Sequence, residues 1–201
     1  VDVPQPEGVP KALHWCTDQA NAGRLVTHYG AQVLVAAGHW HAWDGRRWAA
    51  NEADVYRKAC MLSSIIKTEA ASIRGKAQAG GPDAAAMKKA DELAVALEKW
   101  STKSEMKGAI EAAVGLSKKM LAVPAETLDA DPWLLNVRNG VVDLRTGRMR
   151  SHARTDRMTK ICTATLEPGT QCPHWLAFLQ QVTGSDAAQM HYLQKVFGYC
   201  L

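Results

Sequence analysis

Apolar and polar residues follow two different periods along this chain. Short apolar runs bounded by glycine turns occupy residues 33–49 and 133–166, whereas between about 52 and 123 apolar residues recur every three to four positions. The first pattern predicts β-hairpins and the second predicts helices. The expected fold class is therefore α+β, a central helical bundle with β-hairpin or meander elements before and after it.

The opening of the chain predicts a linker followed by a helix. Residues 1–13 are rich in proline and carry little pattern. Thr17 or Asp18 then supplies an N-cap oxygen for a helix to about His28, with Gly30 as its stop. The candidates for burial in this helix are Ala20, Leu25 and Tyr29.

A hairpin with a return strand is expected next. The strands are predicted over 33–36, 39–43 and 46–49, with a turn at Asp44-Gly45. Trp40 and Trp43 are three apart, so in a regular strand their side chains point to opposite faces.

The helical part, about 52–123, is expected to hold three helices that form a small bundle. The first runs for about 25 residues from Glu52 and is broken by the Gly-Gly-Pro sequence at 80–82. Asp83 caps the second, which continues to about Trp100, and the third is capped within 101–104 and ends before Pro124. The apolar stripe of the third helix is predicted to comprise Met106, Ala109, Ile110, Ala113, Val114, Ser117, Met120 and Leu121.

Residues 133–166 predict a β-meander. Asn139-Gly140 lies between apolar runs and predicts a type I′ turn, which needs positive φ at both central residues. A second turn around Gly147 leads into a strand from Arg148, and residues 158–166 predict a further strand. Beyond the meander, helices are expected over 173–182, opened by Pro173, and from a cap at Ser185 or Asp186 through Phe197.

Charge is concentrated rather than evenly spread. The chain is only mildly basic, with a net charge of +4 and a pI near 8.8. The window 145–160 alone carries six cations against Asp156, more than the net charge of the whole chain. The cations are Arg145, Arg148, Arg150, Arg154, Arg157 and Lys160.

This basic window is the leading candidate for a functional surface. Arg148, Arg150, His152 and Arg154 are spaced two apart, so in an extended strand they share one face. A row of guanidinium groups can follow a phosphate backbone with little sequence preference. The alternative is a solvated sheet face that only keeps the protein in solution.

A second candidate surface combines aromatic and basic side chains. Trp40, Trp43 and Trp48 lie near Arg46 and Arg47 and could form a stacking platform for unpaired bases. The alternative, more usual for tryptophan, is a place in the core or an interface. The lysine pairs at 88–89 and 118–119 are interpreted simply as solvated helix faces.

Catalytic and metal chemistry are weakly represented. A Gly-x-x-x-x-Gly-Lys-Ser/Thr phosphate loop does not occur, and Asp129 and Asp131, the only pair with the spacing of a two-metal site, are followed at once by Pro132, so capping of a turn is preferred. Zinc at His14 and Cys16, or at Cys172 and His174, lacks the usual spacing. The prediction is no catalytic residue, no metal and no cofactor.

The cysteines, the apolar runs and the start of the chain indicate the kind of protein to which this sequence belongs. The five cysteines contain no Cys-x-x-Cys pair, which favours reduced, mostly structural thiols. No apolar run approaches the ~20 residues of a membrane span. The start has neither methionine nor a basic signal segment, so we expect a piece of a longer polypeptide.

Several separate motifs, in order along nearly the whole chain, resemble the region just upstream of the helicase in phage and plasmid primase-helicases of the poxvirus D5-like type. They are the opening helix at 17–25, Trp-Asp-Gly at 43–45, the stretches 128–136 and 139–147, and the ends 173–179 and 192–199. On this resemblance, residues 14–201 form one helicase-associated domain.

The resemblance also implies a function. A primase or primase-like domain would precede this domain and a superfamily 3 helicase, with its ATP and Mg²⁺, would follow it. The domain would link the two, favour hexamer assembly and engage DNA, expected to be single-stranded, in the cytoplasm of a bacterial cell that carries the phage or plasmid. The alternative is a protein–protein interaction module without DNA contact; an independent enzyme is a third and remoter reading.

Overall fold

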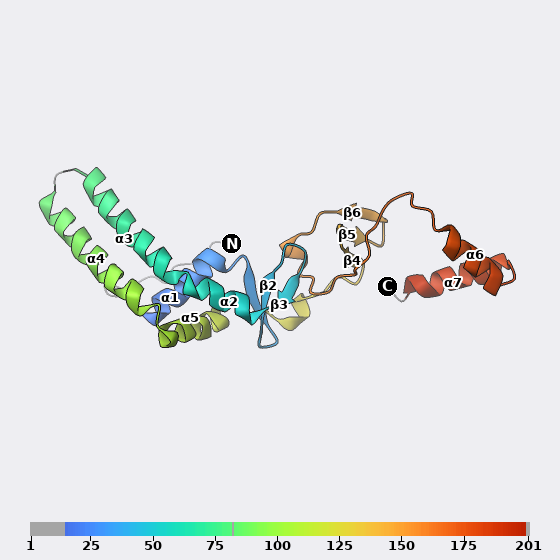
Figure 1. Cartoon of the computed structure of the whole chain (residues 1–201), viewed down its shortest axis with the longest axis horizontal. Helices are drawn as coiled ribbons and strands as arrows, with labels where there is room; N and C mark the ends of the chain where they lie inside the picture. Colours follow the sequence, from blue (N-terminus) through green and yellow to red (C-terminus); the bar gives the residue numbers. More distant parts are fainter. Residues whose placement is uncertain (1–14, 82, 200–201) are drawn as a thin grey trace. The chain divides into compact units, whose positions relative to one another are not determined.

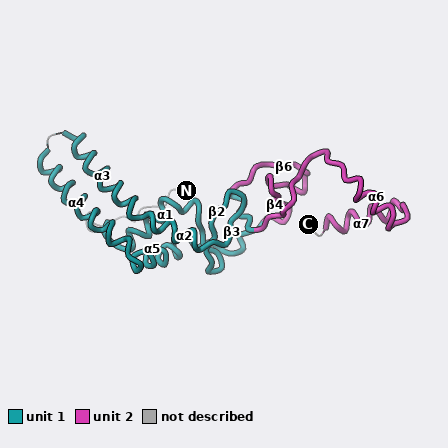
Figure 2. Tube along the Cα trace, viewed as in Figure 1, with its two compact units in different colours: residues 1–130, 154–159 teal, residues 131–153, 160–201 magenta. Residues whose placement is uncertain are grey.

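The chain divides into two compact units, which are coloured separately in Figure 2. The computed structural model describes residues 15–81 and 83–199, so the predicted linker over 1–13 and His14 lie outside the described residues. The first unit comprises residues 1–130 and 154–159, and the second comprises 131–153 and 160–201. Helices together with two three-stranded antiparallel sheets confirm the α+β class (Figure 1).

The first unit contains five α-helices and one sheet among its described residues. Its elements are α1 (Asp18–Tyr29), β1 (Val33–Ala36), β2 (His39–Trp43), β3 (Trp48–Ala50), α2 (Glu52–Cys60), α3 (Leu62–Ala79), α4 (Ala84–Lys103), α5 (Lys107–Met120), and the short 3-10 helices η1 (Ala125–Thr127) and η2 (Arg154–Asp156). Two predicted caps are confirmed, because Thr17 accepts from the Ala20 N–H and Asp83 accepts from the first turn of α4.

The long helix predicted from Glu52 is wrong, because the chain breaks it at Met61 into α2 and α3. Each half packs on a different partner. Val55 of α2 is buried with the first sheet, whereas Ile66 of α3 is buried against Leu97 of α4. A bend between α2 and α3 allows the apolar faces of both helices to be buried. The spacing of apolar residues along the sequence does not predict this bend.

The third predicted helix is shorter than expected. Its N-cap is Met106 rather than a residue of 101–104, and the buried Ser104 instead accepts a hydrogen bond from Asn21. Ala113, Val114 and Ser117 are buried as predicted, but Met106 and Met120 at the helix ends are exposed. The stripe is therefore correct in its middle and at Leu121, which packs on the core, and wrong at Met106 and Met120.

Both faces of the first sheet are covered, so its tryptophans pack in the core on one face or the other. The strand order is β1-β2-β3. On one face Trp40 packs with α1, α2 and α5, and on the other Trp48 packs with Trp43, Val123 and Leu128. Trp40 and Trp43 thus lie on opposite sides, as predicted.

The second unit contains a smaller sheet and a helical hairpin. Its elements are β4 (Leu134–Val137), β5 (Gly140–Asp143), β6 (Arg148–Arg150), α6 (Pro173–Val182) and α7 (Ala187–Tyr199). Pro173 opens α6 as predicted, and Asp186 caps α7 by accepting the Ala188 N–H.

The turn predicted at Asn139-Gly140 is displaced by one residue. Val137 pairs with Gly140, so the loop is Arg138-Asn139, and none of these loop residues has positive φ. The side chain of Asn139 both donates to and accepts from the backbone of Leu166, which holds the loop in its shape. The first sheet has the expected turn geometry instead, at Ala37-Gly38 with φ of 49° and 79°.

The strand predicted over 158–166 does not form. This segment is irregular, yet it follows β4: the Cys162 N–H donates to the Asn136 carbonyl and the Arg138 N–H donates to that of Ala164. These two bonds do not follow one strand register. The segment 158–166 therefore has backbone partners in β4 and its turn but forms no regular ladder.

Candidate nucleic-acid interface

The eight predicted cationic residues separate into two groups of four. Arg46, Arg47, Arg154 and Arg157 belong to the first unit, and Arg145, Arg148, Arg150 and Lys160 belong to the second. The basic window of the sequence is therefore not one continuous row along a strand.

The predicted row of four side chains holds only over β6. Arg148 and Arg150 lie opposite Asp143 and Val141, on one face of the second sheet, and both are exposed. The strand ends at Arg150, so His152 turns to the Val137 carbonyl, 2.9 Å away, and Arg154 lies in η2. The shared face predicted for His152 and Arg154 is wrong because the extended backbone stops before them.

The four predicted cationic residues of the first unit take part in the fold through their side chains or their backbone. Arg154 donates to the Ala31 carbonyl at 3.2 Å, and Arg47 donates to the Thr159 carbonyl at the same distance. Arg47 also lies 3.6 Å from the carboxylate of Asp44, which accepts the Arg46 and Arg47 N–H groups. Arg157 is half-buried at φ 50°, and its carbonyl accepts the Asp129 N–H.

Arg145 is paired rather than available. Its Nη2 lies 3.0 Å from Oδ1 of Asp131, and its guanidinium stands over the Trp133 ring, 5.4 Å from the ring centroid. The hydrogen bonds from Arg145, and next the Trp133 N–H, hold the pKa of Asp131 below its usual range. Asp131 thus caps the entry to the meander, as the simpler alternative predicted.

Three exposed cations lie on or near the second sheet without a side-chain contact in the fold that the structure describes. They are Arg138, Arg148 and Lys160. Within the described part of the chain, none of their side chains has an ion-pair partner. Arg138 was missed at the sequence level, although its place directly before Asn139-Gly140, in a hairpin loop, is a signal for exposure.

The predicted tryptophan platform is wrong. Trp40 and Trp48 are 3% and 5% exposed, and the half-buried Trp43 packs on Trp48 with ring centroids 5.7 Å apart. Both faces of the first sheet are covered, so these rings form core and offer no face to a base. Trp133, which sequence reasoning left aside, is 50% exposed.

Metal ligands do not gather within residues 15–81 and 83–199, where no three His, Cys, Asp or Glu side chains could hold an ion together. Asp129 binds the Thr159 N–H at 2.7 Å, so the predicted alternative to a metal applies to it as well. Of the four described cysteines, Cys60, Cys162 and Cys172 are exposed and Cys16 is half-buried, so the expectation of structural thiols fails for three of them, and Cys200 lies outside the described residues. Burial raises the pKa of the Cys16 thiol.

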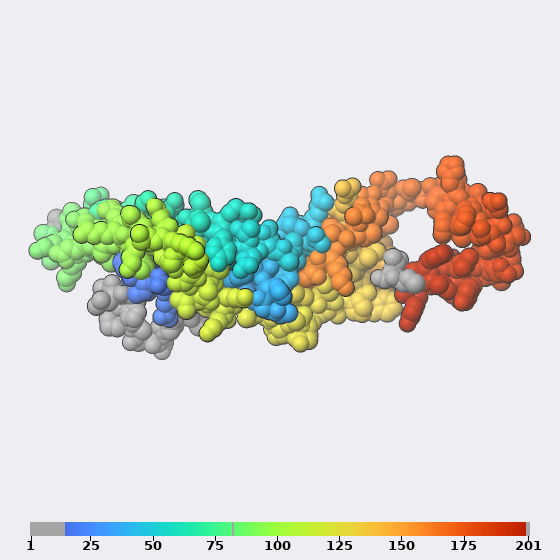
Figure 3. All heavy atoms as spheres, turned by 60° about the horizontal axis from the view of Figure 1, so that its bottom comes forward, coloured from blue at the N-terminus to red at the C-terminus, as the bar shows by residue number. Residues whose placement is uncertain are grey.

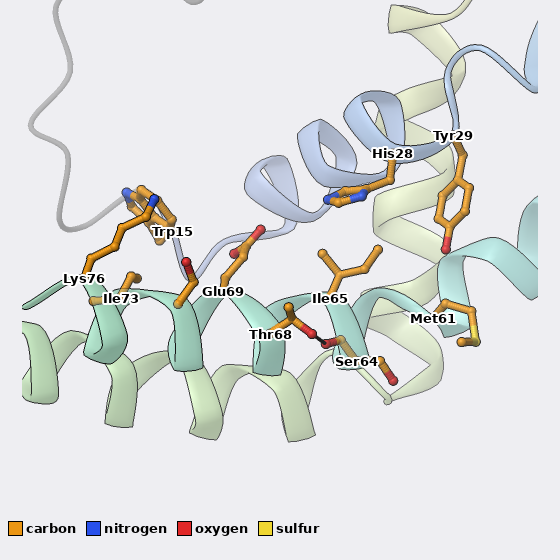
Figure 4. Close-up of a pocket in the computed structure, with 11 residues that line it drawn as sticks. Trp15, His28, Tyr29, Met61, Ser64, Ile65, Thr68, Glu69, Ile73 and Lys76 are labelled. Atoms are coloured by element: carbon orange, nitrogen blue, oxygen red, sulfur yellow. Dashed lines mark hydrogen bonds between the residues drawn. The ribbon is translucent and has the colours of Figure 1, made fainter. Parts of the chain in front are cut away.

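A groove of about 470 Å³ lies between α1 and α3 in the first unit, and Figure 4 shows the residues that line it. Its polar groups with described partners serve the fold: Thr68 donates back to the Ser64 carbonyl, and Glu69 is held by Arg24. Ile65, Ile73 and Trp15 supply apolar walls. These contacts stabilise α1 against α3, so we assign no binding function to the groove.

The helical hairpin of the second unit presents an unusual amount of apolar surface. Atoms of α6 and α7 lie against one another in Figure 3, and Trp175 contacts both Phe178 and Phe197. Large apolar side chains are nevertheless 37–92% exposed: Trp175, Leu176, Phe178, Val182, Tyr192, Val196, Phe197 and Tyr199. Such a patch is typical of a protein contact. None of the described helices has the length and apolarity needed to cross a bilayer.

Comparison with known proteins gives one family. The model of the family described as D5 N terminal like matches residues 22–184, most of the chain. No curated protein matches the chain. The match ends in the turn between α6 and α7.

Proposed function

Because the chain belongs to the D5 N terminal like family, the non-catalytic N-terminal domain of primase-helicase proteins, we propose that it links a primase to a superfamily 3 helicase, aids hexamer assembly and engages single-stranded DNA. ATP and Mg²⁺ would act in the parent helicase of the phage or plasmid, and this domain would take neither.

One observation carries the DNA part of the proposal. Arg138, Arg148 and Lys160 are exposed on the second unit and lack ion-pair partners among the described residues. Cations that are not neutralised by a neighbouring carboxylate gain most from a phosphate, because binding releases the counterions of the nucleic acid. Of the other predicted cations, Arg47, Arg145 and Arg154 donate side-chain hydrogen bonds within the protein.

The linking part of the proposal is supported by α6 and α7. Two helices of ten and 13 residues are too small to bury eight large apolar side chains between themselves. A neighbouring helicase domain that covers this surface would stabilise the hairpin by removing apolar area from water. The family context provides such a neighbour.

The test replaces Arg138, Arg148 and Lys160 together with alanine and measures binding of a labelled single strand against salt concentration. Each lost phosphate contact lowers the slope of log Kd against log salt by about 0.7, so we expect a decrease of about 2 together with weaker binding. The matched control removes three charges from exposed positions of α4, as Lys88→Ala, Lys89→Ala and Lys99→Ala. Equal losses in both triple variants would count against a localised DNA surface.

A second candidate function is a protein–protein module without DNA contact, favoured by the same exposed surface on α6 and α7. It predicts that the wild-type chain binds the single strand no better than the arginine and lysine variant does. The salt titration therefore separates the two proposals.

A further inference from the structure

Trp133 and Arg145 lie together and are both exposed at one end of the second sheet. The ring is half exposed, and the guanidinium lies over it at 5.4 Å. About half of the Arg145 side chain is exposed as well. Aromatic rings and guanidinium planes of this kind stack on bases in proteins that bind single strands.

Both groups are held in place before any ligand arrives. The Trp133 carbonyl accepts the Leu144 N–H at 2.8 Å, which continues the pairing of β4 with β5 by one residue. Asp131 accepts a hydrogen bond from the backbone N–H of Trp133 at 3.0 Å and from both terminal nitrogens of Arg145, at 3.0 and 3.3 Å. One carboxylate thus holds the Trp133 backbone and the Arg145 guanidinium in place together, which lowers the entropy lost when a ligand binds.

Charge at this place favours stacking over phosphate binding. Asp131 and Asp143 both lie near Arg145, with closest nitrogen–oxygen distances of 3.0 and 3.9 Å. A ligand therefore gains little from the charge of Arg145. The aromatic ring is then the main group left for a ligand to contact. Arg148, exposed at the start of β6 three residues after Arg145, could bind a phosphate next to the stacked base.

We infer that Trp133, supported by Arg145, is a stacking site for one unpaired base of a single-stranded nucleic acid, without sequence preference. This inference rests on the proposed DNA engagement. It adds a contact that recognises the lack of base pairing, since only an unpaired base has a free face to offer.

The test compares two oligonucleotides of about 16 nucleotides, the upper range of such sites, one of oligothymidine and one abasic with the same backbone. Trp133→Leu keeps apolar volume without an aromatic face, and Trp133→Phe keeps a face. We expect Trp133→Leu to bind oligothymidine about tenfold more weakly and the abasic strand as the wild type does, with an unchanged salt slope. Trp133→Phe should stay close to the wild type.

The outcomes separate the two proposals. Thermal unfolding of both variants checks that each is folded. If Trp133→Leu binds oligothymidine as tightly as the wild type, or loses equally on both strands, the stacking site is overturned while DNA engagement stands. If the wild type binds neither strand, the proposed DNA function fails first and the stacking site with it.

Discussion

At the scale of single residues, the least expected feature is a buried arginine. Arg24 of α1 is 7% exposed and makes a two-pronged contact to Glu69 of α3, with Nη2 to Oε2 at 2.7 Å. It also donates to the Trp15 carbonyl and to Asn21, which in turn accepts the indole N–H of Trp100. Every polar group in this chain of contacts has a partner, which is what permits its burial.

Arg24→Ala should therefore lower the free energy of unfolding by about 3 kcal/mol, because it leaves the carboxylate of Glu69 without its partner. The control is Arg57→Ala, which breaks the exposed pair with Asp54 and should cost at most about 0.5 kcal/mol. Urea unfolding of both variants measures the difference. Similar losses would mean that the Arg24 pair contributes no more than a surface pair.

At the scale of elements, glycine marks where backbones approach closely. Gly140 opens β5, and a Cβ built there would lie 2.5 Å from the Arg150 carbonyl oxygen and 2.9 Å from Cγ of Met149. The residue is therefore required by contact with β6, not by the positive φ that the sequence pattern suggested. Gly115, in the middle of α5, has open space at the same position.

Gly140→Ala should destabilise the second sheet by about 1–3 kcal/mol, because backbone must move to admit the methyl group. Gly115→Ala should instead stabilise α5 by about 0.5–1 kcal/mol, since alanine has the higher helix propensity. Denaturant unfolding of the two variants gives both signs. A neutral Gly140→Ala would indicate that β5 and β6 are less closely paired than described.

At the scale of the whole molecule, the first unit is not one continuous piece of chain. Residues 154–159 return to it and complete the covering of β3. The Trp48 N–H donates to the Met158 carbonyl and its indole N–H donates to that of Arg154, while the Met158 side chain is 9% exposed. Asp129 binds the backbone N–H of Thr159 at 2.7 Å.

A chain that ends at Ala130 should consequently lose about 3 kcal/mol of stability in the first unit, from the lost burial of Met158 and from the two hydrogen bonds that Trp48 can no longer donate. Its tryptophan fluorescence should shift to the red as Trp48 is exposed. A chain that ends at Thr159 retains the segment and should keep the spectrum of the full first unit. If both truncated chains behave alike, the returning segment adds nothing to that core.

Much of the architecture is available in the sequence because its causes are local. The order of helices and strands follows from apolar period, and the caps Thr17, Asp83 and Asp186 bind N–H groups two or three residues away. The resemblance to D5-like primase-helicases, carried by short motifs in order, is confirmed by the family match. The helix break at Met61 could not be predicted from the sequence, because it depends on which elements α2 and α3 pack against in the folded protein.

The cations show the same division between local and distant causes. The residue order determined by itself that positive charge gathers in 145–160 and that Arg148 and Arg150 share a strand face. Only the tertiary structure decided which of them are exposed without a partner, because Arg145 meets Asp131 and Arg154 meets the Ala31 carbonyl across long sequence separations. Such pairings depend on the folded path of the chain, which no pattern of neighbouring residues records.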